Sequence, residues 1–281
     1  MAEGSLTAKF TAFKLDELDP KASPEFAAIL NDLAGRPSIL HMLRFYQARL
    51  VEDASPGNVY LAKLAWLFAH GQPVDLSGHY YGTTLVLRQG GSPFGGVLNF
   101  LWGRTVGPVS PWAGKSFTSV PEETITSYTD GPDQGSLPVF LGINCFSEVA
   151  GSFWNTAGIE FMTFWIGLQE APVSEQERYG YERKGGLFIS RQAESVDPDN
   201  VGKKVLQLNY RWPKLHNPPP LCYLIDEMVE IAEGLYLGQL LFASGLLVKY
   251  DPSHPNADCR YTHYGYFLLM DESWYQKGEE A

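Results

Sequence analysis

The chain is short of positive charge. It has 21 Lys and Arg residues against 32 Asp and Glu residues among its 281 positions, a formal net charge of −11. Its basic clusters are no longer than pairs such as Lys203-Lys204. Phosphate groups and anionic lipid surfaces are bound by larger clusters of Lys and Arg. The sequence therefore predicts neither a nucleic-acid partner nor docking on an anionic membrane.

Cysteine is also scarce. Cys145, Cys222 and Cys259 lie far apart, are odd in number, and show neither metal-ligand spacing nor the pattern of a disulfide framework. Free thiols in a reducing cytosol are the simplest interpretation. The N-terminal residues MAEGSLTAKF lack the apolar core of a secretory signal. We expect a cytoplasmic protein with no bound metal.

Long hydrophobic runs are missing as well. The most apolar stretch, residues 235–248, is about fourteen residues long and is interrupted by Gln239 and Ser244. A membrane-spanning helix needs roughly twenty residues, so no membrane insertion is predicted. The P-loop, GxSxG, HExxH and complete GxGxxG motifs are absent, and no cofactor is predicted. GGSPFGG, residues 90–96, contains a proline and predicts a hairpin loop or lid.

Aromatic residues are abundant. They make up 14% of the chain, within an ordinary balance of 44% hydrophobic and 19% charged residues. Such a composition is typical of a β-rich core, of a ligand cavity with ring-lined walls, or of both. The length suits one large domain or two modest ones. No pattern in the sequence predicts an oligomeric state.

The first part of the chain predicts helices. Ser23-Pro24 and Ser38 are helix starts, and each is followed by apolar residues at helical spacing. A third segment, residues 59–69, is apolar on nearly all sides and ends before Gly71, which is typical of a buried helix. We expect residues 1–75 to form an N-terminal helical segment.

From about Leu76 the pattern changes to short β-like stretches separated by Gly, Pro, Asn and Asp. Many strands without intervening helices predict an antiparallel sandwich or barrel over residues 76–281, so the fold class is mainly β (α+β). The predicted strands are 79–88, 123–129, 138–145, 160–168, 186–191, 204–212, 228–231, 236–242, 246–250 and 264–270.

The stretch GLYLGQLLF, residues 234–242, can be a helix, a phosphate-binding turn or a strand. A helix would hold two interior glycines at about 1 kcal/mol each, and a phosphate loop needs more glycines and a following Lys. We therefore predict a strand that follows a turn at residues 232–234. Tyr236 and Gly238 are expected to face the interior as ligand-binding positions, with Gly238 leaving room for a ligand or a bulky neighbour. Gln239 is expected to face out.

The Gly-x-Tyr-x-Gly pattern of residues 234–238, together with the series of strands, resembles the calycin group of lipocalin-like and nitrobindin-like barrels. Those families carry a Gly-x-Trp signature on a barrel strand. Here tyrosine replaces the tryptophan, and the motif lies near the C-terminus. The resemblance implies a closed, lipocalin-like barrel that holds one apolar small molecule, which a barrel of this size permits.

The segment KVLQLNYRW, residues 204–212, alternates an apolar face with a polar face that contains Asn209 and Arg211. The polar face is either exposed on the surface or lines the lumen. In the second case Asn209 and Arg211 would orient a ligand carbonyl or carboxylate, because the guanidinium can bind a carboxylate through two hydrogen bonds.

Two clusters of tyrosine and histidine flank the predicted β unit. In the first, Tyr81 follows His79, and in the second Tyr266 follows His263. A cavity-facing phenol can donate a hydrogen bond to a ligand oxygen, whereas a core tyrosine satisfies its hydroxyl on the backbone. Each histidine is a candidate base. We expect Tyr81 and Tyr266 among the ligand-binding residues if their side chains reach the cavity.

Asp226 and Glu227 form an acidic pair at the start of a predicted strand. Adjacent strand residues point to opposite faces, so they cannot be the facing carboxylates of a glycosidase. Asp226 is a candidate general base, and a solvated turn is the alternative. SPWAGKSF, residues 110–117, predicts a glycine-containing turn whose Lys115 is either an exposed lysine or neutralises an acidic ligand at a barrel mouth.

These observations favour a barrel that binds a hydrophobic or aromatic small molecule. The alternative is an enzyme without a cofactor, an isomerase, cyclase, hydratase or decarboxylase, acting in the same cavity with one or two acid–base groups. A haem site with a single histidine ligand is a third hypothesis. Titratable groups with shifted pKa values that converge in the cavity would favour the enzyme, and a uniformly apolar lumen would favour a carrier.

Overall fold

The structure is a computed structural model of the whole chain. It describes residues 9–16, 23–87, 111–128, 138–148, 153–245, 248, 250–251 and 260–279. The predicted loop at residues 90–96 and Cys259 lie outside the described residues, as does most of the predicted strand 246–250.

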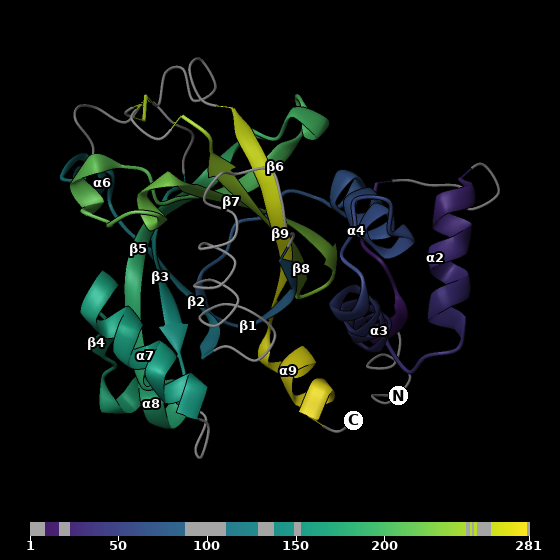
Figure 1. Cartoon of the computed structure of the whole chain (residues 1–281), viewed down its shortest axis with the longest axis horizontal. Coiled ribbons are helices and arrows are strands. Elements are labelled where there is room, and N and C mark those ends of the chain that lie inside the picture. The colour runs from purple at the N-terminus through teal and green to yellow at the C-terminus, as the bar shows by residue number, and fades with distance from the viewer. Residues whose placement is uncertain are drawn as a thin grey trace.

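Eight antiparallel strands close into a barrel (Figure 1). Their order is β3-β2-β1-β9-β8-β7-β6-β5, and the pairing of β3 with β5 closes the sheet. The short strand β4, Gln169–Glu170, pairs with the other edge of β5. The barrel strands are β1 Gly78–Leu87, β2 Trp112–Ser119, β3 Phe140–Phe146, β5 Arg183–Glu194, β6 Lys204–Asn209, β7 Leu224–Ala232, β8 Leu235–Ala243 and β9 Tyr261–Met270. The fold-class prediction, a mainly β α+β chain with an antiparallel barrel, is confirmed.

Helices α3 Ile39–Glu52 and α4 Val59–His70 pack against one side of the barrel, and α2 Pro24–Ala34 packs on these two helices (Figure 1). Ser23 and Ser38 accept hydrogen bonds at the starts of α2 and α3, as predicted. The helices bury an apolar face against outward side chains such as Leu237 and Leu268. The C-terminal helix α9, Glu272–Glu279, adds the buried Trp274 to the same cluster.

The other helices include two corrections to the predicted strands. Residues 123–126 belong to helix α6, Glu122–Thr126, and residues 160–166 belong to helix α7, Phe153–Ile166. The segment of α7 is apolar on nearly all sides, so its periodicity does not separate helix from strand. Helix α8, Val173–Tyr179, was not predicted. Single 3-10 turns lie at η1 Pro198–Asn200, η2 Pro213–Leu215 and η3 Leu221–Tyr223.

A third correction concerns β2, which the sequence predicted as a turn. Gly114 lies inside the strand at a φ of 142°, next to a shift in register against β3. Its Cα packs so closely on β1 that an added Cβ would lie 2.1 Å from the carbonyl oxygen of Tyr80. The glycine therefore marks a bulge and a close backbone approach instead of a turn.

Side chains of β8 face alternately the barrel interior and the helix-covered exterior. Tyr236 and Phe242 belong to the interior cluster, whereas Leu237 packs on the helices. Gly234, at a φ of 78°, turns the chain from β7 into β8. The predicted strand, its turn and its inward face are confirmed.

Candidate functional site

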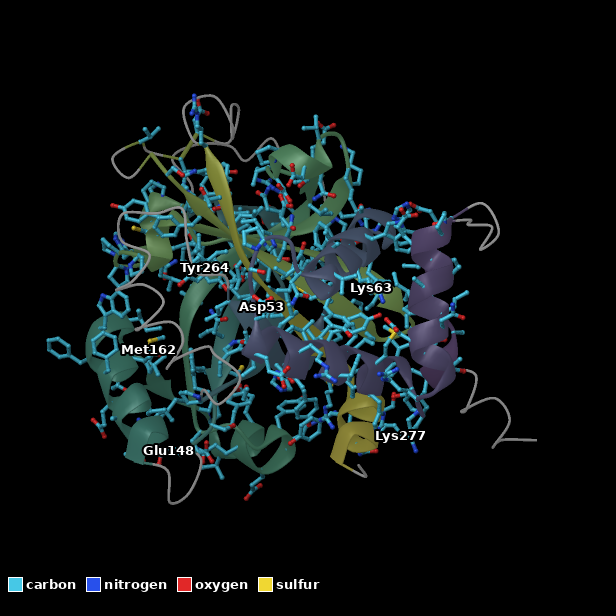
Figure 2. All side chains as sticks on the ribbon, turned by 45° about the vertical axis from the view of Figure 1, so that its right-hand side comes forward. Asp53, Lys63, Glu148, Met162, Tyr264 and Lys277 are labelled. Atoms are coloured by element: carbon cyan, nitrogen blue, oxygen red, sulfur yellow. The ribbon has the colours of Figure 1, made fainter. Side chains whose placement is uncertain are left out.

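A cavity lies inside the barrel. The space that the centre of a water-sized sphere can reach in it is about 50 Å³. Much of its wall is apolar, and the last turns of α7 supply two of the wall residues. Figure 2 labels two residues that line the cavity, Met162 on α7 and Tyr264 on β9. The aliphatic part of the wall is formed by Met162, Ile166, Leu221, Leu224 and Leu240.

One polar cluster projects into this apolar cavity. Lys115 on β2 lies beside Asn144 on β3 in the strand register, while Asp226 comes from β7. The Lys115 Nζ donates to Asn144 Oδ1 at 2.7 Å, to the Tyr210 hydroxyl at 2.5 Å and to Asp226 Oδ2 at 3.1 Å. The cluster therefore joins residues from four separate parts of the barrel.

Burial of the Lys115–Asp226 ion pair is nearly complete, since the two side chains are only 4% and 2% exposed. Four aromatic rings surround the ammonium group, with centroids 5.1–5.4 Å from Nζ; these are Trp112, Phe188, Tyr210 and Phe267. Aromatic faces at this distance attract a cation. The rings and the Asp226 carboxylate together favour a positive charge at this place.

Loss of water shifts the pKa values of the cluster. Desolvation lowers the pKa of Lys115, and the Asp226 carboxylate opposes that shift. Desolvation raises the pKa of Asp226, opposed by Lys115 and Tyr210, and it raises the pKa of Tyr210 well above its usual value. The proton affinities of Lys115 and Asp226 thus approach each other, while Tyr210 stays protonated and able to donate.

One oxygen of the cluster has no hydrogen-bond partner among the described residues. Asp226 Oδ2 accepts from Lys115 and, at 3.2 Å, from the Tyr210 hydroxyl. Asp226 Oδ1 is buried without a hydrogen bond among the described residues. A buried acceptor of this kind is uncommon and calls for a specific explanation. A donor placed in the cavity would supply the missing hydrogen bond.

Asp226 is the predicted candidate base that the structure places in the cavity. The alternative, a solvated turn, is wrong because Asp226 and Glu227 lie within β7 and are 1% and 0% exposed. The expected opposition of their side chains is confirmed, since Glu227 contacts Ser195 and Gln239 outside the barrel. Lys115, predicted at a barrel mouth, lines the interior instead.

The predicted residues Asn209 and Arg211 do not face the lumen. Tyr210 between them lines the cavity. Asn209 Oδ1 accepts from the Arg211 backbone N–H, and the guanidinium contacts the Tyr261 hydroxyl in a cluster outside the barrel. The surface alternative is also wrong, because both residues are buried, at 3% and 5% exposure.

The two tyrosine–histidine clusters also lie outside the barrel. Tyr81 stacks on Tyr275 of α9 with ring centroids 3.9 Å apart, and its neighbour Tyr80 takes the inward position. His79 Nδ1 lies 3.0 Å from Ser116 Oγ, and desolvation lowers the pKa of His79 to about 4.

The second cluster, on β9, has the same placement. Tyr266 belongs to the core under the helices, and the His263 ring packs on it at 4.4 Å. Tyr264 between them is the residue that lines the cavity. The structure therefore separates His263 and Tyr266 from Asp226 by the thickness of the barrel wall.

The two residues of β8 that were predicted to face inward, Tyr236 and Gly238, are not among the residues that line the cavity. Tyr236 packs edge-on against Tyr80 at 5.4 Å. An added Cβ at Gly238 would lie 2.2 Å from Phe267 Cζ, so Gly238 makes room for a neighbouring ring. Gln239 faces out as predicted but is 0% exposed, because its amide donates to Glu227 Oε2 at 3.0 Å.

Two residues of the cluster, Tyr210 and Asn144, were not considered as site residues from the sequence, and Lys115 was considered only as an exposed lysine or at a barrel mouth. Once residues 112–119 are a strand, Lys115 shares a face with Phe117, which places a cation among apolar side chains. Tyr210 likewise shares the apolar face of Leu206 and Leu208. Asn144 carried no distinguishing pattern. A charged residue on an apolar strand face was therefore the signal for Lys115.

Comparison of the chain with protein-family models, with curated proteins and with solved structures gives no significant match. In the part of the chain that the structure describes, no helix is long and apolar enough to cross a membrane. The same residues contain no group of three His, Cys, Asp or Glu side chains arranged to hold a metal ion. Fold and site define a class, a closed eight-stranded antiparallel barrel with a buried ion pair in its cavity.

Proposed function

We propose that the protein binds an apolar, ring-containing small molecule in the barrel cavity, as lipocalin-like barrels do, with a hydroxyl of the ligand donating to Asp226 Oδ1. The observation that carries the proposal is this buried carboxylate oxygen, which has no partner among the described residues and belongs to Asp226, a residue that lines the apolar cavity. An unpaired buried polar group costs about 1–3 kcal/mol. A ligand donor at this oxygen would remove that cost, while its rings pack on the wall.

The hydroxyl is tested by a matched pair of ligands, 2-naphthol and 2-methoxynaphthalene, which share their rings but differ in the donor. A hydrogen bond to a charged group contributes about 1.5–3 kcal/mol, so we expect 2-naphthol to bind at least about tenfold more tightly in isothermal titration calorimetry. In the Asp226→Asn variant the difference in affinity between the two ligands should be smaller. Equal affinities for the wild-type protein would contradict the role of Asp226.

A cofactor-independent enzyme is the second candidate, and the convergence of Lys115, Asp226 and Tyr210 in one apolar cavity favours it. Groups with shifted pKa values that meet in a cavity are typical of acid–base catalysis. In this candidate Asp226 removes a proton next to a carbonyl, and Lys115 or Tyr210 donates to the oxygen on which charge develops. This chemistry suits an isomerase or cyclase.

Proton removal can be measured without knowledge of the natural substrate. Nuclear magnetic resonance of 1-tetralone in D₂O reports the exchange of the hydrogens next to its carbonyl. We expect the protein to accelerate this exchange and 2-naphthol to inhibit it. Exchange at the rate of the buffer, with 2-naphthol bound normally, would leave ligand binding as the function.

The haem hypothesis is not proposed, because none of the described histidines lines the cavity. We propose a small molecule as the partner. We propose no nucleic-acid partner, because the net charge of −11 disfavours contact with phosphate groups. A cytoplasmic location is proposed on the same grounds as before, the three scattered cysteines.

A further inference from the structure

Lys115 has the surroundings of a lysine that reacts with carbonyl compounds. We propose that Lys115 forms a protonated imine with an aldehyde or ketone of apolar, ring-containing structure bound in the cavity. The proposal rests on the proposed ligand cavity and names the chemical class of molecule that reacts there. It goes beyond noncovalent binding, because it assigns a covalent bond between Nζ and the carbonyl carbon.

Lys115 is 3% exposed, and it lines the cavity in which the ligand is proposed to bind. A lysine in an apolar pocket loses its proton more readily than an exposed one, which is the state required for attack on a carbonyl. Burial of an ion pair contributes little to stability by itself, so stability alone does not account for a lysine at this place.

A protonated imine carries the same single positive charge as the lysine ammonium. The four surrounding rings, 5.1–5.4 Å from Nζ, and the Asp226 carboxylate at 3.1 Å can stabilise that charge before and after the reaction. The product would therefore keep its counter-ion and its aromatic surroundings.

Asp226 and Tyr210 provide a path for the protons of this reaction. The ammonium passes one proton to Asp226, and the free amine adds to the carbonyl carbon while the C=O electron pair moves to oxygen. A proton moves from nitrogen to that oxygen, with the Tyr210 hydroxyl, 2.5 Å from Lys115 Nζ and 3.2 Å from Asp226 Oδ2, as the relay. Asp226 then returns its proton, the oxygen leaves as water, and the nitrogen lone pair forms C=N.

The net reaction is balanced. The ammonium form of Lys115 and the carbonyl compound give the protonated imine and one water, with no change in total charge and no oxidant or reductant. Asp226 ends as the carboxylate in which it began. The formation of the bond therefore needs only the groups of the cluster and the bound carbonyl compound.

Reductive trapping tests the proposal. The wild-type protein is incubated with 2-naphthaldehyde and sodium cyanoborohydride, and the modified lysines are located by peptide mass spectrometry. Lys204, whose side chain is 59% exposed, is the internal control. We expect modification at Lys115 to be at least about tenfold faster than at Lys204, because a bound aldehyde is held next to Nζ. Saturating 2-naphthol should suppress the modification of Lys115 alone.

The outcomes separate the imine from the binding site. Modification of exposed lysines only, with 2-naphthol still bound, overturns the imine and leaves the proposed function standing. Failure of both 2-naphthol binding and Lys115 modification overturns both. A Lys115→Arg variant, which keeps the charge, should lose the imine absorbance that forms without reductant. If that variant does not fold, the comparison within the wild-type protein decides.

Discussion

The charged residues of the cavity are buried at a cost in stability. Two ions taken out of water rarely stabilise a fold relative to apolar residues of similar size, although removal of one partner is strongly destabilising. The Lys115–Asp226 pair fits this description, since its side chains are 4% and 2% exposed. Stability alone therefore does not account for its presence in the barrel interior.

A first prediction concerns the cost in stability of burying the ion pair. We expect Lys115→Met to lower the free energy of unfolding by about 3–5 kcal/mol, because it leaves a buried carboxylate without a counter-ion. The double variant Lys115→Met, Asp226→Leu should recover most of the loss. Urea denaturation followed by circular dichroism gives the values.

The control for this prediction is Lys204→Met, which breaks an exposed pair with Glu194 whose side chains are 59% and 66% exposed. That change should cost less than about 1 kcal/mol. A double variant no more stable than Lys115→Met would contradict the interpretation of the ion pair.

A second prediction concerns Glu227. Desolvation raises its pKa to about 7 from 4.5, against hydrogen bonds from Ser195, Val196 and Gln239. The folded protein therefore binds this proton more tightly than the unfolded chain. The stabilisation is complete below pH 4.5 and is lost as the pH rises through 7, by about 3 kcal/mol.

Glu227→Gln removes this titration. Relative to the wild-type protein, the variant should gain about 3 kcal/mol of stability between pH 4.5 and pH 8, on top of a constant cost from the altered hydrogen bonds. Urea denaturation across that range measures the difference. Glu194→Gln, at an exposed residue, serves as the control, and a difference that does not vary with pH would show that Glu227 has an ordinary pKa.

At the scale of single residues, the sequence predicted the side of a strand on which a side chain lies better than it predicted whether that side chain is buried. Alternation correctly placed Asp226 and Glu227 on opposite sides and Gln239 outside the barrel. It could not show that Gln239 and Glu227 bind each other beneath a neighbouring segment, since that contact joins two strands and the residues 195–196. A polar residue on the outer face was taken for an exposed one.

At the scale of elements, close packing of β8 on β9 gives a third prediction. An added Cβ at Gly238 would overlap the Phe267 ring, which also faces Lys115. Gly238→Ala should therefore lower stability by about 1–3 kcal/mol through overpacking and should weaken ligand binding by displacing that ring. Thermal melts and calorimetry with 2-naphthol measure the two effects.

Gly35→Ala is the matched control, because an added Cβ at Gly35 meets nothing within 4 Å. It should change stability by less than about 0.5 kcal/mol. Normal melting and normal binding in Gly238→Ala would show that Phe267 moves aside freely.

The elements that the sequence predicted share strong local signals. Helices α2 and α3 have serine caps, and the β7–β8 hairpin turns at Gly234. The misassigned segments lack such signals. Helix α7 is apolar on nearly all sides, and β2 contains a glycine whose role depends on contact with β1. Long-range contacts, absent from a local pattern, decided both.

At the scale of the whole molecule, the barrel was predictable and its cavity residues were not. A series of short strands predicts a closed antiparallel sheet, but the polar cluster combines β2, β3, β7 and the residue after β6. Such a cluster exists only after closure. Asp226 was selected from the sequence and Lys115 was considered at a barrel mouth, whereas Tyr210 became recognisable as a site residue only once β6 was placed.

The outer side of the barrel has a different role. Helices α3 and α4 pack on one part of it, over β1, β7 and β8, and α2 packs on these helices; the three share one apolar core with β7, β8 and β9. The division of the chain at residues 75 and 76 stays a prediction. We propose that the helical segment braces the barrel wall, because its side chains contact the outer faces of strands whose inner faces line the cavity.

Occupancy of the cavity tests the central claim most directly. Equilibrium dialysis against 2-naphthol should give one bound molecule for the wild-type protein. Leu240→Trp, which fills the cavity from β8, should bind none while it keeps the wild-type circular dichroism spectrum. Val201→Trp, at a residue that is 84% exposed, controls for the added indole and should bind normally. No binding to the wild-type protein, or equal binding to Leu240→Trp, would contradict the account.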